Sequence, residues 1–185
     1  PAADYPHKNL TIIPRVARHL VDAGLDRHCF TLTLPHDSRT WEKISGDARD
    51  LSVERYIENI GPFSYADALR LYTSATVVFI PSILETFSTS YLEAIAVERP
   101  LVVADRPFAR EICGDAAIYF DPRSPKSAAN AILRALTNDN TESRWQEARK
   151  QVLLRYGYYN TRYEAIIRIL QKILTEHTSS RWANH

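Results

Sequence analysis

The fold is decided by residues 79–107, which read FIPSILETFSTSYLEAIAVERPLVVADRP. Two short apolar runs in this stretch, one closed by Pro81 and one formed by LVVA, predict buried strands. The residues between them predict a helix that is apolar except for Glu93, and the hydroxyl residues STS at 88–90 are suited to cap its first turn. The stretch is therefore expected to form a strand, a loop, a helix and a second strand.

Outside this stretch, short apolar runs continue to alternate with amphipathic segments. We expect further strands at residues 28–34, 55–60 and 117–120, and helices at residues 10–24, 41–44, 64–73, 108–112, 124–136, 141–156 and from Thr161 onward. This alternation predicts an α/β fold, a Rossmann-like parallel sheet with helices on both faces. Ligands of such sheets bind at the carboxyl ends of the strands, where the loop before Glu93 lies.

Composition excludes several classes of protein. Of the 185 residues, 45% are hydrophobic and 24% charged, which is typical of a soluble globular protein, and a net charge of +1 gives no reason to expect a nucleic-acid partner. No apolar run approaches the ~20 residues of a membrane span, so any membrane association of the full protein is not encoded here. The two cysteines lack metal-ligand spacing, and we expect free thiols and a cytoplasmic location. The absence of methionine suggests a piece of a longer protein.

The predicted start of the central helix has a chemical use. The first N–H groups of a helix lack internal partners and carry partial positive charge, so they suit a phosphate. Glu93 lies just inside that helix, where its carboxylate could accept hydrogen bonds from two vicinal hydroxyls, and Glu85 lies in the loop, where a sugar attached to the phosphate would be. The alternative for Glu93 is a structural salt bridge with Arg99 or Arg106, because a buried acid needs a partner.

These residues resemble the E-x7-E motif of retaining glycosyltransferases, family 4 in particular. The motif is ETFSTSYLEAIA at residues 85–96, preceded by PS as in that family. RPLVVAD at residues 99–105 and EICGDAAIYFDP at residues 111–122 resemble the segments that follow the motif in the family.

The resemblance implies a domain organisation. Residues 1–185 would form the C-terminal, nucleotide-sugar-binding domain of a GT-B protein, with residues 160–177 as the terminal helix that crosses back to the N-terminal domain. That acceptor-binding domain would lie outside this chain, in the same protein or as a separate chain. The family's donor domain also has a strand before the turn at residues 5–9, in the middle of the sheet. We therefore expect the sheet to lack its first strand and to show a gap there.

The resemblance also implies roles for particular residues. Glu85 would act near the donor sugar, without being a nucleophile in the manner of glycoside hydrolases. The expected donor-binding residues are Lys8 for the diphosphate, Phe63 against the base, Glu93 for the ribose hydroxyls, and the loop N–H groups of Phe87, Ser88 and Thr89. The open alternatives are a solvated surface position for Lys8 and core packing for Phe63. Neither a metal nor another cofactor is expected, because helix starts and basic side chains would hold the diphosphate.

The expected function is transfer of a sugar, with retained anomeric configuration, from a UDP-, GDP- or ADP-sugar to a saccharide or lipid-linked acceptor in polysaccharide or glycolipid synthesis. We expect this chain alone to bind the donor weakly and to catalyse little or no transfer. Two alternatives stay open. One is an NDP-sugar epimerase or a phosphorylase of the same architecture. The other is a non-catalytic Rossmann-like nucleotide-binding or scaffolding domain, because Thr86 and Ser88 stand where family members often have glycine.

Overall fold

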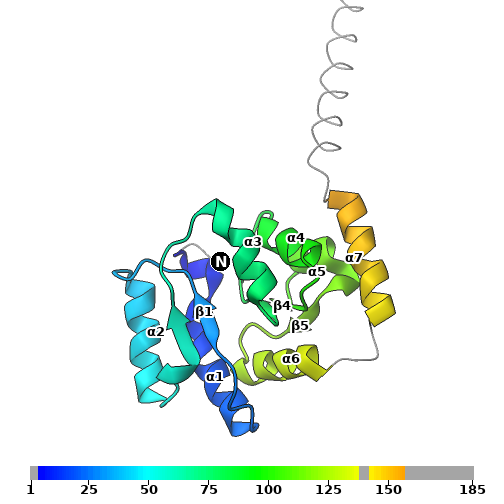
Figure 1. The fold of residues 1–185 in the computed structure, drawn as a ribbon. Coiled ribbons are helices and arrows are strands. Elements are labelled where there is room, and N and C mark those ends of the chain that lie inside the picture. Colours follow the sequence, from blue (N-terminus) through cyan, green and yellow to red (C-terminus); the bar gives the residue numbers. More distant parts are fainter. Residues whose placement is uncertain (1–3, 138–141, 157–185) are drawn as a thin grey trace, which may run out of the picture.

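A computed structural model describes residues 4–137 and 142–156 of the chain, and Figure 1 shows short strands surrounded by helices. The described elements are η1 (Pro6–Lys8), η2 (Leu10–Ile12), α1 (Ile13–Asp22), β1 (Phe30–Leu32), α2 (Arg39–Asp50), η3 (Glu54–Tyr56), β2 (Ile57–Asn59), α3 (Tyr65–Ser74), β3 (Val78–Ile80), α4 (Thr89–Ala96), β4 (Leu101–Ala104), α5 (Pro107–Cys113), η4 (Gly114–Ala116), β5 (Ile118–Phe120), α6 (Pro125–Thr137) and α7 (Glu142–Tyr156). The terminal helix expected at residues 160–177 lies outside the described residues.

The described strands are all parallel and fall into two groups. β1 pairs with β2, and β4 lies between β3 and β5 with Phe79 opposite Val102. Helices α1, α2 and α6 supply the core on one face, and α3, α4, α5 and α7 supply the core on the other. β4 is buried on both sides, and its residues alternate between these two cores. The predicted α/β fold with a parallel sheet between helices is confirmed.

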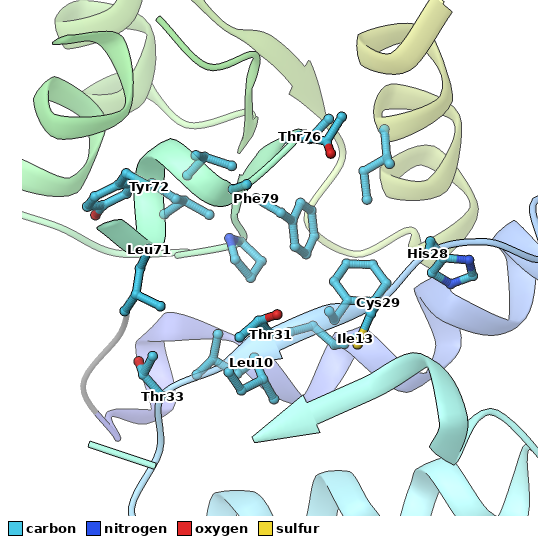
Figure 2. A pocket seen from close by; sticks show the side chains of 18 of the residues that line it. Leu10, Ile13, His28, Cys29, Thr31, Thr33, Leu71, Tyr72, Thr76 and Phe79 are labelled. Carbon is cyan, nitrogen blue, oxygen red and sulfur yellow. The ribbon is translucent and has the colours of Figure 1, made fainter. Parts of the chain in front are cut away.

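The sheet is interrupted between β1 and β3, since no pairing joins these two strands in the described part of the chain. A cavity of about 370 Å³ occupies the interruption and is lined by residues 27–33 on one side and by most of residues 71–82 on the other. Figure 2 shows Thr31 and Phe79 on the two sides of this cavity, which we call the sheet gap.

Aromatic rings indicate the width of the sheet gap. Phe79 stacks on Phe120 with the ring centroids 5.2 Å apart, although β4 lies between their two strands. On the other side, Phe79 meets Phe30 of β1 edge-on at 5.9 Å. The Phe79 ring thus makes contacts of similar length across β4, which is one strand, and across the gap. The gap is therefore about one strand wide. The interior gap expected from the family resemblance is therefore present among the described residues.

Two helices differ from the sequence expectation. The short helix expected at residues 41–44 is the longer α2, which starts after Ser38, whose Oγ accepts a hydrogen bond from the Trp41 N–H at 3.2 Å. Gly46 does not end this helix, because Ile44 and Ala48 anchor the helix on the core on either side of it. The first helix begins as the 3-10 turn η2 and becomes α-helical only at Ile13.

No helix among residues 4–137 and 142–156 is long and apolar enough to cross a membrane.

Candidate functional site

The loop between β3 and α4 covers residues 81–88 and follows the carboxyl end of β3. Pro81 and Ser82 at its start are buried, and the Ile83 N–H donates a hydrogen bond of 2.8 Å to the His7 carbonyl. This backbone bond joins the loop to η1, although the two segments are far apart in the sequence. It places Lys8, the last residue of η1, beside the loop.

Lys8 and Glu85 form an ion pair, with Nζ 2.6 Å from Oε1. Their side chains are only 18% and 10% exposed, so water screens the pair weakly. The structure thus brings together the lysine predicted to contact a diphosphate and the acid predicted to lie near a sugar. An ammonium group has three donors, so Lys8 can keep this partner and still reach an anion.

Glu93 has a different partner from those considered in the sequence. The Tyr72 hydroxyl on α3 donates to Glu93 Oε2 at 2.7 Å. Arg99 instead donates to the carbonyl of Thr73 at 2.6 Å, and no salt bridge joins Glu93 to an arginine within the described ranges. The alternative of a structural salt bridge to Arg99 or Arg106 is therefore wrong for these residues.

Tyr72 is a stable hydrogen-bond donor at neutral pH. Its side chain is 2% exposed, and this burial is the main cause that raises the pKa of the Tyr72 hydroxyl well above its ordinary value. The Glu93 carboxylate raises the pKa further, whereas a hydrogen bond with the Ser90 side chain lowers it. The hydroxyl therefore stays protonated and continues to donate to Glu93.

The N-terminus of α4 has no side-chain cap. Ser88 occupies the N-cap position and is buried, but its hydroxyl makes no capping hydrogen bond, and the first turn holds no acidic residue. Of the three hydroxyl residues at 88–90 predicted as cap candidates, Ser88 takes the N-cap position, but its side chain does not cap the turn. Thr89, the first residue of the helix, is exposed. The N–H groups of this turn are suited to an external acceptor.

The hydrogen-bond partners of the two acids line the same cavity, although neither Glu85 nor Glu93 is among its lining residues. Lys8, which holds Glu85, and Tyr72, which holds Glu93, both line the sheet gap together with Ser82 and Ser90. Tyr72 is visible at one side of the cavity in Figure 2. The two carboxylates predicted to act together are thus each bonded to a residue that lines this cavity.

Ser82 and Tyr91 add buried hydroxyl groups close to this region. Both residues are buried, and neither hydroxyl has a hydrogen-bond partner among the described residues. Glu85 is close enough to Tyr91 to contribute to the raised pKa of its hydroxyl, although burial is the main cause. A buried hydroxyl without a partner is unfavourable, so a bound polar group would stabilise this arrangement.

Neither of the two aromatic candidates lines the sheet gap. Phe87 packs into the core of α3, α4, α5 and α7, with its ring 6.0 Å from that of Tyr156. Phe63 is half-buried between β2 and α3, and it is not among the residues that line the sheet gap. The side chain of Phe87 is therefore structural, and only its backbone remains a candidate for ligand contact.

Sequence reasoning missed Tyr72 as a partner of Glu93. The signal available was a tyrosine on the apolar side of one predicted helix and an acid on the apolar side of the next. A buried tyrosine hydroxyl and a buried carboxylate each need a partner, and together they satisfy one another. No group of three His, Cys, Asp or Glu side chains suited to a metal ion occurs in the part of the chain that the structure describes.

Comparison with known proteins shows the family. Residues 5–152 match the family of glycosyl transferases group 1. The chain is 34% identical over 143 residues to an uncharacterized glycosyltransferase of Methanocaldococcus jannaschii, covering 71% of this chain and 36% of that protein. It is 31% identical over 148 residues to the D-inositol 3-phosphate glycosyltransferase of Corynebacterium glutamicum, covering 77% of this chain and 35% of that protein.

Solved structures show the same fold. A glycosyltransferase from Rickettsia africae superposes with a TM-score of 0.79 at 16% identity, covering 94% of this chain and 46% of that one. Sucrose-phosphate synthase from Thermosynechococcus elongatus gives a TM-score of 0.76 at 16% identity, covering 93% and 44%. This chain spans about a third of the length of the curated relatives above and less than half of these two structures. The chain therefore belongs to the glycosyl transferases group 1 family and has the α/β fold of its GT-B members.

Proposed function

We propose that this chain is the donor-binding half of a retaining glycosyltransferase and that its substrate is a nucleotide-sugar. The observation that carries the proposal is that the Lys8–Glu85 pair and the Tyr72–Glu93 hydrogen bond flank the uncapped start of α4 along the chain. Family membership supports glycosyl transfer. The nucleotide-sugar and the retained configuration are our inference.

Each group has a role that follows from its chemistry. The first N–H groups of α4 and the Lys8 ammonium carry positive charge and would bind the diphosphate, with loop N–H groups from Phe87 to Thr89 reaching the distal phosphate and sugar hydroxyls. The Glu93 carboxylate would accept hydrogen bonds from the two ribose hydroxyls. Phe63, on the segment after β2, would lie against the base.

The same groups would assist the transfer step. When the bond between the anomeric carbon and the phosphate oxygen breaks, negative charge grows on the diphosphate and positive charge on the sugar. Lys8 and the start of α4 would stabilise the former, and Glu85 would stabilise the latter. Because Lys8 already holds Glu85 at 2.6 Å, the two charges are oriented before the donor binds. These groups supply the positive charge that a metal would otherwise provide.

The acceptor side belongs to the rest of the protein. We propose that an N-terminal domain, in the same protein or as a separate chain, presents a saccharide or lipid-linked acceptor, and that this chain alone catalyses little or no transfer. We propose a role in polysaccharide or glycolipid synthesis, which the names of two relatives support, and a cytoplasmic location is our own inference. One relative is an O-antigen chain mannosyltransferase of Salmonella typhimurium, and the other is a D-inositol 3-phosphate glycosyltransferase.

Calorimetric titration of the chain with UDP, GDP and ADP tests the proposal. We expect one of them to bind with a micromolar to millimolar Kd, and we expect Glu93→Gln to weaken that binding about tenfold or more, since a hydrogen bond to a charged group contributes about 1.5–3 kcal/mol. Glu54→Gln, an exposed acid on η3, is the matched control and should not change the Kd. Absence of binding at millimolar concentrations would instead favour a scaffolding domain. The observation that supports this alternative is the Lys8–Glu85 ion pair, in which each charge already has a partner within the protein.

A further inference from the structure

The Tyr72 hydroxyl is a buried polar group that the proposed reaction does not itself use. Tyr72 lies near the end of α3, with its ring in the core shared with α4 and its hydroxyl on Glu93 Oε2 at 2.7 Å. A phenylalanine would fill the same space, so packing alone does not explain the hydroxyl. Removing a buried hydroxyl from water is costly unless it is hydrogen-bonded, and here its acceptor is the carboxylate of the proposed site.

The structure points to Tyr72 as a positioning residue: we propose that it fixes the Glu93 carboxylate so that the site selects a nucleotide with both ribose hydroxyls. This inference rests on the proposed function, because it assigns a ligand group to Glu93. Among the described residues, Tyr72 is the only side chain that donates a hydrogen bond to Glu93. The orientation of this half-buried carboxylate therefore depends on the Tyr72 hydroxyl.

The surroundings hold the hydroxyl in one direction. Ser90, in the first turn of α4, also hydrogen-bonds the Tyr72 hydroxyl. Because the Tyr72 hydroxyl donates its proton to Glu93, its oxygen remains free to accept from Ser90. The series of hydrogen bonds from Ser90 through Tyr72 to Glu93 thus connects two proposed binding positions. One is the start of α4, where we propose that the diphosphate binds, and the other is Glu93, where we propose that the ribose binds.

The Glu93 carboxylate has acceptor positions beyond the one that Tyr72 uses. An ionised carboxylate offers about four lone-pair positions, and Tyr72 uses one of them on Oε2. The remaining positions suffice for two vicinal hydroxyls. A carboxylate free to rotate would lose orientation entropy on binding the same diol, so the tyrosine should improve recognition of ribose without touching it.

The test compares two ligands on three proteins. The ligands are the nucleoside diphosphate that binds the chain most tightly in the titration above, of UDP, GDP and ADP, and its 2′,3′-dideoxy analogue. The proteins are the unmodified chain, Tyr72→Phe and Tyr119→Phe. Tyr119 is the matched control, because its hydroxyl also lies in this core region and donates to a backbone carbonyl, that of Gly114 at 2.6 Å.

We expect the unmodified chain to prefer the ribonucleotide at least about tenfold, and Tyr72→Phe to reduce this preference about 3- to 10-fold while the dideoxy analogue binds as before. Tyr119→Phe should keep the full preference. If Tyr72→Phe does not fold, Ser90→Ala, which removes only the second contact of the hydroxyl, should reduce the preference in the same direction by a smaller factor.

The outcomes separate this inference from the proposed function. An unmodified chain that binds no nucleoside diphosphate would overturn the proposed function and this inference with it. An unmodified chain that prefers the ribonucleotide, together with a Tyr72→Phe variant that shows the same preference, would overturn the positioning role alone. Equal weakening of both ligands by Tyr72→Phe would also overturn it, because a loss of folded protein or of packing affects the two ligands alike.

Discussion

The ion pair between Lys8 and Glu85 should make a measurable contribution to stability, because its side chains are only 18% and 10% exposed. Two unit charges 2.6 Å apart attract each other by about 6 kcal/mol at an effective dielectric constant of about 20, and desolvation cancels much of that gain. Lys8→Met leaves the Glu85 charge in a half-closed site without its partner. We expect each single substitution, Lys8→Met or Glu85→Gln, to cost about 2–3 kcal/mol of unfolding free energy, somewhat below the ~3–5 kcal/mol of fully buried pairs.

The double variant shows whether the two charges act on each other. Lys8→Met with Glu85→Gln removes both charges, so we expect a loss of only about 1 kcal/mol and a coupling energy of about 3–5 kcal/mol. Urea unfolding followed by circular dichroism measures these values, and each single substitution should lower Tm by about 4–12 °C. The control is the pair Arg18 and Asp22, 2.8 Å apart on α1 but 33% and 57% exposed, whose coupling should be only about 0.3–0.5 kcal/mol.

Additive losses at Lys8 and Glu85 would contradict the reasoning, because they would mean that the two charges do not interact in the folded protein. A coupling no larger than that of the exposed control pair would mean that water screens the site, and the preorganised charges we propose for the donor would then be absent.

Three further predictions concern other parts of the chain. Burial raises the pKa of the Cys113 thiol to about 12, so Ellman's reagent at pH 8 should modify exposed Cys29 first and Cys113 only when the protein unfolds. Burial lowers the pKa of His28 below its ordinary 6.5, so the unfolded chain binds the extra proton more readily than the folded protein. The free energy of unfolding should therefore fall as the pH drops below about 6.5. The urea midpoints at about pH 5.5 and about pH 7.5 should differ less in the His28→Gln variant than in the unmodified chain. The sheet gap should accept an apolar strand. Adding Leu-Val-Val-Ala-Gly before Asp4 should raise Tm by at least about 5 °C and protect the amides of β1 and β3 from hydrogen exchange. The control peptide Leu-Val-Pro-Ala-Gly, in which proline disrupts strand pairing, should do neither.

The fold was predictable because its signals are local. The apolar run LVVA, with no polar position, indicated a strand buried on both faces, and β4 is one. Element lengths were less predictable, since Gly46 weakens a helix locally while burial of Ile44 and Ala48 keeps α2 intact. The interruption of the sheet followed from the family resemblance. The residues themselves do not encode it, because a pattern of alternation does not say how many strands precede a turn.

The site was predictable in its charged residues and not in their partners. The spacing of Glu85 and Glu93 placed one acid in the loop and one in the helix, as observed. Their partners lie on elements that are distant in the sequence. The hydrogen bond from the Ile83 N–H to the His7 carbonyl, which brings Lys8 to Glu85, is a tertiary contact without a local signature. Tyr72 was likewise indistinguishable from a core aromatic residue until α3 and α4 were seen together.

A crystal structure of the chain with its tightest-binding nucleotide-sugar tests the central claim most directly. The account predicts the diphosphate at the N–H groups of the first turn of α4 and within hydrogen-bond distance of Lys8 Nζ, the ribose on Glu93, and the sugar beside Glu85. A nucleotide bound elsewhere, or one whose ribose lies away from Glu93, would contradict it.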